Sequence, residues 1–495
     1  MYSPPILKDF LLRSGSLSAV KLIGALGRML LLRILGSEGI GLYQMAYTFY
    51  GLLITVVTGG FASALSLATA KNTEAGKQLF HFSLVILVVL GSALGLLTYL
   101  FAPQIADLFG DSELVRPIQL CTPAILIVPV LSLMRGFLQG LQHYGYIALS
   151  ELIEQTVRVF AMVLLAGFLI QKELSEAVGG VIFGAVIGAF CAFLFLLVPL
   201  LSSSSKKQFQ QTVPPSLSVF FMSSLAIMGT RIILPAAEFI ESLLVPNRLV
   251  HAGFSVQEAT KIYGEFFGMA VSIVFVPTFI IGSLCHIILP RLTIAWDTLD
   301  TAGFMNKVKI AFLAALLWGG AASFFLATYS ETISVLIVGD GSLAVSIQYL
   351  SLASLLASMR DLSTTILWTM DEKKKPLIGL ILATIVSSIL NFYLIGISGF
   401  SIAGVAIGIL SFELTSLTFN ILSLKPMVRL GKFVRFIFKE TFIYAIFLAC
   451  MHLVATFVHT QLISWNSPFV QQLVMGGTFL VLLPLYLYGH FISRR

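Results

Sequence analysis

The amino-acid sequence predicts an all-α polytopic membrane protein with about 14 transmembrane helices. The first observation is composition, since 58% of the residues are hydrophobic and only 11% are charged. A soluble domain typically contains about 25% charged residues to cover its surface. The second observation is that the apolar residues form runs of about 20, the length that crosses the hydrocarbon core of a bilayer. A soluble protein with a large apolar core is therefore excluded.

The apolar runs define the expected spans and their direction. They cover residues 14–35, 42–69, 80–101, 117–141, 146–170, 177–201, 217–246, 259–289, 308–330, 343–369, 376–397, 400–424, 436–458 and 468–490. Lys and Arg are concentrated in the segments that this count puts on the same side as the N-terminus. Because basic loops stay inside, both termini are expected to be cytoplasmic.

The longest polar break, residues 202–216, suggests a linker between two lobes. The predicted domains are an N-lobe at 1–201 with spans one to six, a C-lobe at 217–424 with spans seven to twelve, and a basic cytoplasmic loop with two extra spans at 425–495. A repeated Met-Arg pair supports two six-helix halves in the same orientation: Met134-Arg135 in span four and Met359-Arg360 in span ten. Transporters are often built from such repeats.

Charged residues within the spans are the main candidates for function. Each costs roughly 2.5–3.5 kcal/mol at mid-bilayer, so these side chains are expected to face one another or a water-filled cavity. The candidate cavity residues are Lys21, Arg28, Glu151, Glu154, Arg158, Arg231, Glu238 and Glu241. We expect a central polar cavity lined by spans one, two, seven and eight, with span five contributing, whose basic groups bind an anionic head group. The alternative is that pairs such as Glu154 with Arg158, one turn apart, only join helices.

Two acidic residues are candidates for ion coupling. Glu241 lies in span seven, and Glu413 is the one acid in span twelve. Glu413 could bind a cation or a proton, or could simply be hydrogen-bonded.

Glycine and proline mark helix breaks and close contacts. Breaks are expected at Gly59-Gly60, Pro235 and Pro277, and broken helices near charge are where transporters bind substrate. Three sets of glycines spaced by four predict close helix packing: Gly136 and Gly140, Gly180, Gly184 and Gly188, and Gly404 and Gly408.

Motifs for nucleotide, metal or covalent chemistry are missing from the sequence. It contains no G-x-x-x-x-G-K-[ST], no G-x-S-x-G and no metal-spaced Cys/His group, and its four cysteines lie far apart. No cofactor and no enzymatic activity are therefore expected. The basic residues sit at the ends of apolar runs, which is the pattern of a membrane protein rather than of a nucleic-acid-binding one.

Three blocks of sequence resemble a known family. They are GALGRMLLLRILGSEGIGLYQ (24–44), MRGFLQGLQ with SELIEQTVR (134–158), and ESLLVPNRLVHAGFSVQEATKIYGEFFGMA (241–270), followed by Pro277 and Leu289-Pro290. They are similar to the stage V sporulation protein B and polysaccharide-flippase family, in the multidrug/oligosaccharidyl-lipid/polysaccharide exporter superfamily. Glu154, Gln155 and Arg158 match its E-Q-x-x-R motif. Departures are Glu151 in place of a usual Gln, Tyr146 where Pro is common, and Gly59-Gly60-Phe61 in place of Gly-Ile-Pro.

The resemblance implies a two-lobed alternating-access transporter in the bacterial cell membrane. Its implied substrate is a lipid-linked oligosaccharide, an undecaprenyl-pyrophosphate peptidoglycan precursor, used for cell wall or spore cortex synthesis. Membrane lipid and cell-wall synthesis proteins are the other implied partners. Within the resemblance, Lys21 and Arg28 fall among the basic residues of the first helix, while Glu241 and Arg248 flank Pro246 as the family's acid and base do.

The sequence leaves two other functions open. A multidrug or organic-cation antiporter of the same superfamily would need acids to dominate the cavity, whereas span one contains Lys21 and Arg28 without an acid. A scaffold for wall or spore assembly would need none of the intramembrane charges for transport.

Overall fold

The computed structural model describes residues 4–202, 217–397 and 399–424, with parts of 435–457. These residues form helices joined by short connections, and they contain no strand. Within them, nine helices are long and apolar enough to cross a membrane, or ten when one bent pair is counted as a single span. The prediction of an all-α polytopic membrane protein is confirmed. The predicted span 436–458 is described only in part, and 468–490 lies outside the described residues.

The described chain forms two compact units, which divide at Gly264. The first contains Met1–Val250 and Phe254–Gly264, and the second contains His251–Gly253 and Glu265–Arg495. The helices between 217 and 264, which the sequence assigns to the C-lobe, therefore pack within the first unit. The placement of a lobe boundary at 202–216 stays a prediction, since residues 203–216 lie outside the described part of the chain.

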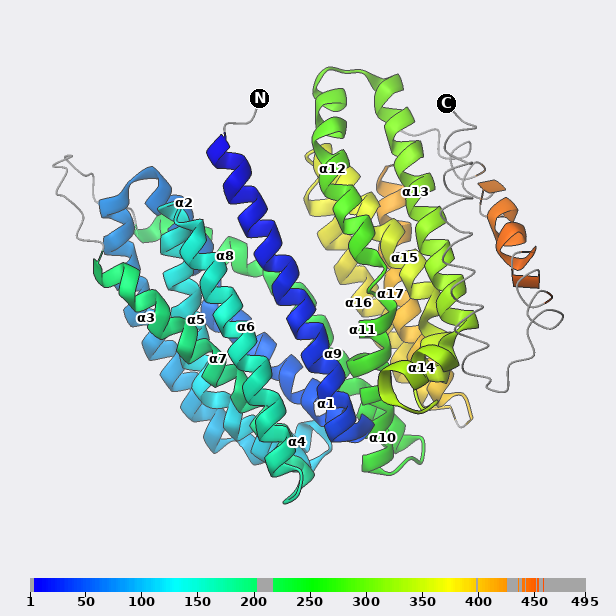
Figure 1. Cartoon of the computed structure of the whole chain (residues 1–495), viewed down its shortest axis with the longest axis horizontal. Helices are drawn as coiled ribbons and strands as arrows, with labels where there is room; N and C mark the ends of the chain where they lie inside the picture. The colour runs from blue at the N-terminus through cyan, green and yellow to red at the C-terminus, as the bar shows by residue number, and fades with distance from the viewer. Residues whose placement is uncertain are drawn as a thin grey trace. The chain divides into compact units, whose positions relative to one another are not determined.

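The first unit consists of helices α1 to α10 (Figure 1). They are α1 (Pro4–Thr58), α2 (Phe61–Lys71), α3 (Thr73–Leu100), α4 (Ala102–Phe109), α5 (Val115–Gly140), α6 (Tyr144–Leu169), α7 (Leu174–Ser202), α8 (Leu217–Arg231), α9 (Ile233–His251) and α10 (Val256–Tyr263), with a short 3-10 turn at Ser112–Leu114. Helix α5 is central and packs against α1, α2, α3 and α7. Its Met134, Leu131 and Leu138 are almost completely buried.

The second unit repeats this packing order. After a π-helical turn at Gly264–Ala270, it contains α11 (Val271–Val274), α12 (Thr278–Asp297), α13 (Thr301–Thr328), α14 (Ser330–Val338), α15 (Ala344–Thr369), α16 (Lys374–Ile395) and α17 (Ser401–Ser423). Helix α15 is central and packs against α12, α13 and α17, as α5 packs against α3 and α7. The Met-Arg pair lies on the central helix of each unit. This recurrence favours the predicted repeat.

Helix α1 contains two helical segments that meet at Gly36. The backbone there has φ 66° and ψ −177°, a region that glycine enters without steric cost. Arg28 and Tyr43, one from each segment, are hydrogen-bonded to each other. Because fifteen residues of straight helix would extend over roughly 22 Å, the two segments must fold back side by side. The first segment corresponds to predicted span one, and the second segment together with α2 corresponds to predicted span two.

The three predicted breaks are present. Helix α1 ends at Thr58 and α2 begins at Phe61, with Gly59 at φ 52° between them. Helices α8 and α9 meet at a 44° bend beside Pro235, whose ring nitrogen cannot donate to the Arg231 carbonyl. Pro277 immediately precedes α12. Each break therefore has a local cause in the sequence.

The predicted close packing at glycine is also confirmed. A Cβ atom on Gly180 or Gly184 of α7 would meet Leu169 or Met162 of α6 at 2.6 and 2.7 Å. Gly184 needs to be glycine, since its Cβ would also lie 2.8 Å from the Met162 backbone nitrogen, whereas at Gly180 the Leu169 side chain would have to move. Gly136 and Gly140 bring α5 against α2, and Gly404 and Gly408 bring α17 against α16 in the same way.

Helix α10 begins with a capping box outside the predicted spans. The Ser255 hydroxyl accepts from the Glu258 amide, and the Ser255 amide and hydroxyl both donate to Glu258 Oε2 at 2.8 Å. These hydrogen bonds lower the pKa of the Glu258 carboxyl below its ordinary value.

Stabilisation of α10 by this cap is expected to depend on pH. Because the pKa is lowered on folding, the contribution is complete above the ordinary carboxyl pKa and is lost as the pH falls through the lowered value. Hydrogen exchange of the first turn of α10, measured between pH 7 and pH 3, should show this loss of protection. Glu258→Gln should remove most of the pH dependence. Equal pH dependence in both proteins would contradict the assignment.

Candidate functional site

A half-buried ion cluster joins helices α5 and α6 in the first unit. Glu154 lies between two guanidinium groups: its Oε2 is 2.8 Å from Arg135 Nη1, and its Oε1 contacts Arg158 Nη2. The three side chains are only 12–21% exposed. Arg135 Nε also donates to Ser150 Oγ at 2.9 Å, which fixes the guanidinium plane. Two cations therefore share one carboxylate, and the cluster keeps an excess positive charge.

Two donors of this cluster have no acceptor within the described part of the chain. They are the buried Arg135 Nη2 and Arg158 Nε. A buried donor without a partner costs about 1–3 kcal/mol, so an added acceptor at these two positions would be stabilising. A guanidinium offers its donors in a planar fork that suits phosphate oxygens. The cluster can thus bind an anion without breaking the Glu154 pairs.

A stripe of tyrosines on the second segment of α1 faces this cluster. Tyr43, Tyr47 and Tyr50 follow one another at i, i+4 and i+7, with ring centroids 5.5 and 5.9 Å apart. Arg158 interacts electrostatically with all three of them. Sequence reasoning missed this stripe, although its helical spacing is visible in the sequence.

The first segment of α1 brings Arg28 into the same part of the unit. Glycines allow this approach, since a Cβ on Gly24 would lie 2.7 Å from Gln155 Nε2 and one on Gly27 would lie 2.8 Å from Val159. Arg28 is half-buried, hydrogen-bonds with Tyr43 and interacts electrostatically with Glu238 of α9. Electrostatic interactions therefore link Glu238 to Arg28 and Tyr43 to Arg158, with the Arg28–Tyr43 hydrogen bond between them.

Helix α9 is held against α1 by a small polar contact and an aromatic one. Thr48 Oγ1 donates to Ser242 Oγ at 2.9 Å, and both residues are buried. Phe239 packs against Phe49 and Phe109, with centroids 6.1 and 5.9 Å apart. These contacts fix the position of α9 along α1, and with it the position of Glu238 relative to Arg28.

The other predicted cavity residues have separate surroundings. Arg231 ends α8 and donates to Ser63 Oγ of α2 at 2.8 Å. Glu241 is half-buried on α9 and interacts electrostatically with Tyr263. Lys21 is exposed on α1, and Glu151 is half-buried on α6. Of the predicted cavity residues, the structure brings Arg28 near Glu238 and pairs Glu154 with Arg158. Arg135, which was not predicted, joins the Glu154 pair. Arg231 contacts Ser63 instead of the other predicted residues.

Gly188 positions the ion pair of α6. A Cβ at this position of α7 would lie 2.6 Å from the Glu154 carbonyl oxygen and 2.9 Å from Arg158 Cβ. We expect Gly188→Leu to force α6 away and to lower stability by about 1–3 kcal/mol. Gly167→Leu is the matched control, because a Cβ on Gly167 meets nothing within 4 Å. Equal thermal stability of the two variants would contradict this role.

Glu413 has a partner that the sequence did not identify. Its Oε2 accepts from Arg360 Nε of α15 at 2.6 Å, and Asp361 Oδ1 lies 3.3 Å from Arg360 Nη1. The Glu413 side chain is 4% exposed. Glu413 is the one acid of its predicted span, but in the fold it is paired with Arg360, because α15 packs directly on α17. Ion coupling at Glu413 stays a prediction.

We expect Glu413→Gln to weaken the α15–α17 contact. The substitution removes one charge-assisted pair, worth about 1.5–3 kcal/mol, and leaves Arg360 without its main counter-charge. Thermal denaturation in detergent should show a lower midpoint. The double variant Arg360→Met/Glu413→Leu should recover part of the loss. An unchanged midpoint for Glu413→Gln would show that the pair contributes little.

No group of three or more His, Cys, Asp or Glu residues in the described chain is placed to bind a metal ion. The four cysteines are all unpaired, and Cys121 and Cys285 are buried. The site residues are charged and phenolic side chains, whose chemistry is binding by charge and hydrogen bonds.

Comparison with known proteins agrees with this architecture. Residues 6–293 match the sequence profile of a family described as "Polysaccharide biosynthesis protein". Stage V sporulation protein B of Bacillus subtilis (strain 168) is 26% identical over 423 residues, covering 83% of this chain and 82% of that protein. Lipid II flippase MurJ of the same organism is 32% identical over 183 residues, 33% of this chain and 34% of that protein.

Two solved structures share the fold. Lipid II flippase MurJ in an inward closed conformation has a TM-score of 0.67 at 16% identity, covering 97% of this chain and all of that one. An inward-facing multidrug resistance MATE family transporter has a TM-score of 0.69 at 14% identity, covering 83% of this chain and 95% of that one. The fold is therefore that of polytopic membrane transporters, and the protein is a multi-pass protein of the bacterial cell membrane.

Proposed function

Because the chain belongs to the polysaccharide biosynthesis protein family, we propose that it moves a lipid-linked oligosaccharide across the bacterial cell membrane by alternating access. The proposed substrate is an undecaprenyl-pyrophosphate peptidoglycan precursor. The similarity to stage V sporulation protein B and to a lipid II flippase supports this substrate class. Transport, rather than catalysis, is the proposed activity.

The observation that carries the proposal is the ion cluster of the first unit, in which the guanidinium groups of Arg135 and Arg158 share the single carboxylate of Glu154. Arg28 adds a third guanidinium in the same unit, where it interacts electrostatically with Glu238. A pyrophosphate has two negatively charged phosphates and cannot cross hydrocarbon unaided. Arg135 Nη2 and Arg158 Nε, which have no acceptor among the described residues, supply charge and hydrogen bonds that would replace its water.

The tyrosine stripe suits the remaining parts of the substrate. Tyr47 is half-buried, and its phenol offers a donor, an acceptor and an apolar ring face. Sugars present both hydroxyl groups and apolar ring faces, so such side chains can hold a saccharide without fixing its identity. In this proposal the lipid tail stays in the bilayer while the head group contacts the polar residues.

The driving force is proposed to be the membrane potential or an ion gradient. Glu241 is the more accessible of the two candidates for ion coupling, because it is half-buried whereas Glu413 is closed in by Arg360. Moving one elementary charge across the membrane is worth about 2.3 kcal/mol per 100 mV.

The proposal is tested in cells in which this protein is the one source of flipping. Lipid II head groups exposed on the outer surface would be labelled with a membrane-impermeant reagent and counted. We expect labelling to depend on expression and to stop when the protein is depleted. Absent labelling together with raised tolerance of organic cations would favour the antiporter. Normal wall synthesis with all the charges in the cluster neutralised would favour a scaffold.

A further inference from the structure

An apolar groove on the first unit lies away from the charged residues described above. Its volume is about 550 Å³, and 12 of its 14 lining residues are apolar. Helix α5 packs between α3 and α7 and forms the floor, where Met134 and Phe137 are buried. Val88 on α3 and Phe190 on α7 are 40% and 45% exposed at the rim, so the groove is open at the surface.

The groove follows from helical periodicity in three segments. On α3 the lining residues Lys77, His81, Leu84 and Val88 fall at i, i+4, i+7 and i+11, a single stripe. On α7, Phe190, Phe193, Leu197 and Leu200 form a second stripe with the same spacing rule. Because both stripes face α5, the groove is long and narrow rather than round.

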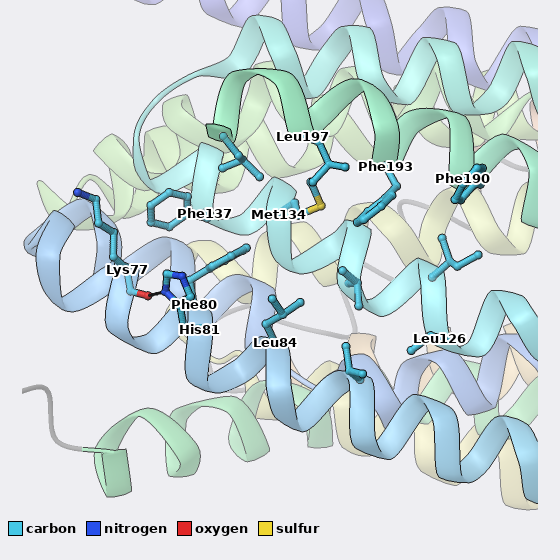
Figure 2. Close-up of a pocket in the computed structure, with 14 residues that line it drawn as sticks. Lys77, Phe80, His81, Leu84, Leu126, Met134, Phe137, Phe190, Phe193 and Leu197 are labelled. Atoms are coloured by element: carbon cyan, nitrogen blue, oxygen red, sulfur yellow. Dashed lines mark hydrogen bonds between the residues drawn. The ribbon is translucent and has the colours of Figure 1, made fainter. Parts of the chain in front are cut away.

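The polar lining residues lie at one end of this groove only. Figure 2 shows Lys77 and His81 together at one end, and Leu126 and Phe190 at the other. Lys77 Nζ is 2.8 Å from Glu74 Oε1, and its side chain is 32% exposed. An ammonium has three donors, so the pair with Glu74 leaves donors for a further acceptor. His81 Nδ1 lies 2.8 Å from the Lys77 carbonyl oxygen, so Nδ1 is the donor of that hydrogen bond. Nε2 is then the nitrogen that faces a ligand, and it donates to a phosphate oxygen in the imidazolium form of the ring.

We propose that this groove binds one acyl chain of an anionic phospholipid, with the lipid phosphate at Lys77 and His81. A methylene occupies about the volume of a water molecule, roughly 30 Å³, so the groove has room for about 18 of them, one acyl chain. An undecaprenyl tail is much longer than this, so a membrane phospholipid fits better than the tail of the proposed substrate. Lys77 also lies in a segment predicted to be cytoplasmic, where the leaflet is rich in anionic lipids.

Site occupancy would stabilise the packing of α3, α5 and α7. Met134 lines the groove and precedes Arg135 of the ion cluster, so the same segment of α5 contacts both sites. The lipid would thus support the helix that presents Arg135. This site stands independently of the proposed transport function, since its evidence is its own geometry.

The test is retention of lipid by the purified full-length protein, measured by native mass spectrometry after exchange into phosphatidylglycerol or phosphatidylcholine with the same chains. We expect one phosphatidylglycerol to be retained. Lys77→Ala/His81→Ala should lower its apparent affinity by about five-fold or more, the effect of removing a cation at an anionic lipid surface. The matched control is Lys375→Ala, because Lys375 has the same 2.8 Å pair with a glutamate and the same 32% exposure.

A second pair of variants tests the tail. Val88→Trp should fill the groove and reduce retention of phosphatidylglycerol, whereas Val89→Trp, at a 60% exposed neighbour that does not line it, should not. Circular dichroism and thermal denaturation would confirm that each variant is folded. Equal retention by Val88→Trp and Val89→Trp would overturn the groove as the binding site. Equal retention of the two lipids, unaffected by Lys77→Ala/His81→Ala, would overturn the anionic head-group assignment.

Discussion

Arg28→Ala is expected to abolish growth of a flippase-depleted strain while the protein still inserts into the membrane at normal levels. Arg28 is half-buried, interacts electrostatically with Glu238 of α9 and hydrogen-bonds with Tyr43 in the second segment of α1. A charge-assisted hydrogen bond to a phosphate is worth about 1.5–3 kcal/mol. Its loss corresponds to about a ten-fold to hundred-fold lower affinity for the substrate head group.

Two further variants make this result specific. Arg28→Lys keeps the charge but loses the planar fork, so it should give intermediate growth. Arg33→Ala is the control, because Arg33 is an exposed arginine on the same segment and is not assigned to the site. Complementation, membrane-fraction immunoblots and external head-group labelling would be measured together. Normal growth of the Arg28→Ala strain would sink the anionic-site assignment.

Glu154→Ala is expected to lower both stability and transport, because it leaves Arg135 and Arg158 side by side without a counter-charge. Removing one partner of a buried ion pair typically costs about 3–5 kcal/mol. The side chains of this cluster are only 12–21% exposed, so we expect a cost near that range. A loss of this size is a large part of the free energy of unfolding of most folded proteins. We expect low yield and an unfolding midpoint many degrees lower.

A double-mutant cycle separates structure from binding. Glu154→Leu/Arg158→Met replaces the pair by apolar groups of similar size and should recover much of the stability. Transport should not return, since one of the anion-binding guanidiniums is gone. Glu372→Ala serves as the control, because its pair with Lys375 has side chains that are 44% and 32% exposed and should contribute no more than about 1 kcal/mol. Full transport by the apolar double variant would assign the cluster a structural role alone.

The sequence by itself determined the fold class and much of the local geometry. Hydropathy predicted helices because unpaired backbone groups cannot face lipid. Gly59-Gly60, Pro235 and Pro277 predicted breaks that the structure contains, since glycine and proline act on the backbone where they stand. The i, i+4 spacing likewise put Glu154 and Arg158 on one face of one helix.

Only the tertiary structure decided which helices meet. Arg135 pairs with Glu154, and Arg360 with Glu413, across helix contacts that sequence spacing does not encode. The fold-back at Gly36 brings Tyr43 to Arg28, and helices 217–264 pack with the first unit although the longest polar break precedes them. Periodicity fixes neighbours within one helix, whereas packing between helices depends on shape: where a glycine removes a Cβ and where a ring or hydroxyl fits. The composition and the local spacings therefore predicted a membrane protein with charged stripes, and the packing determined which charges form the site.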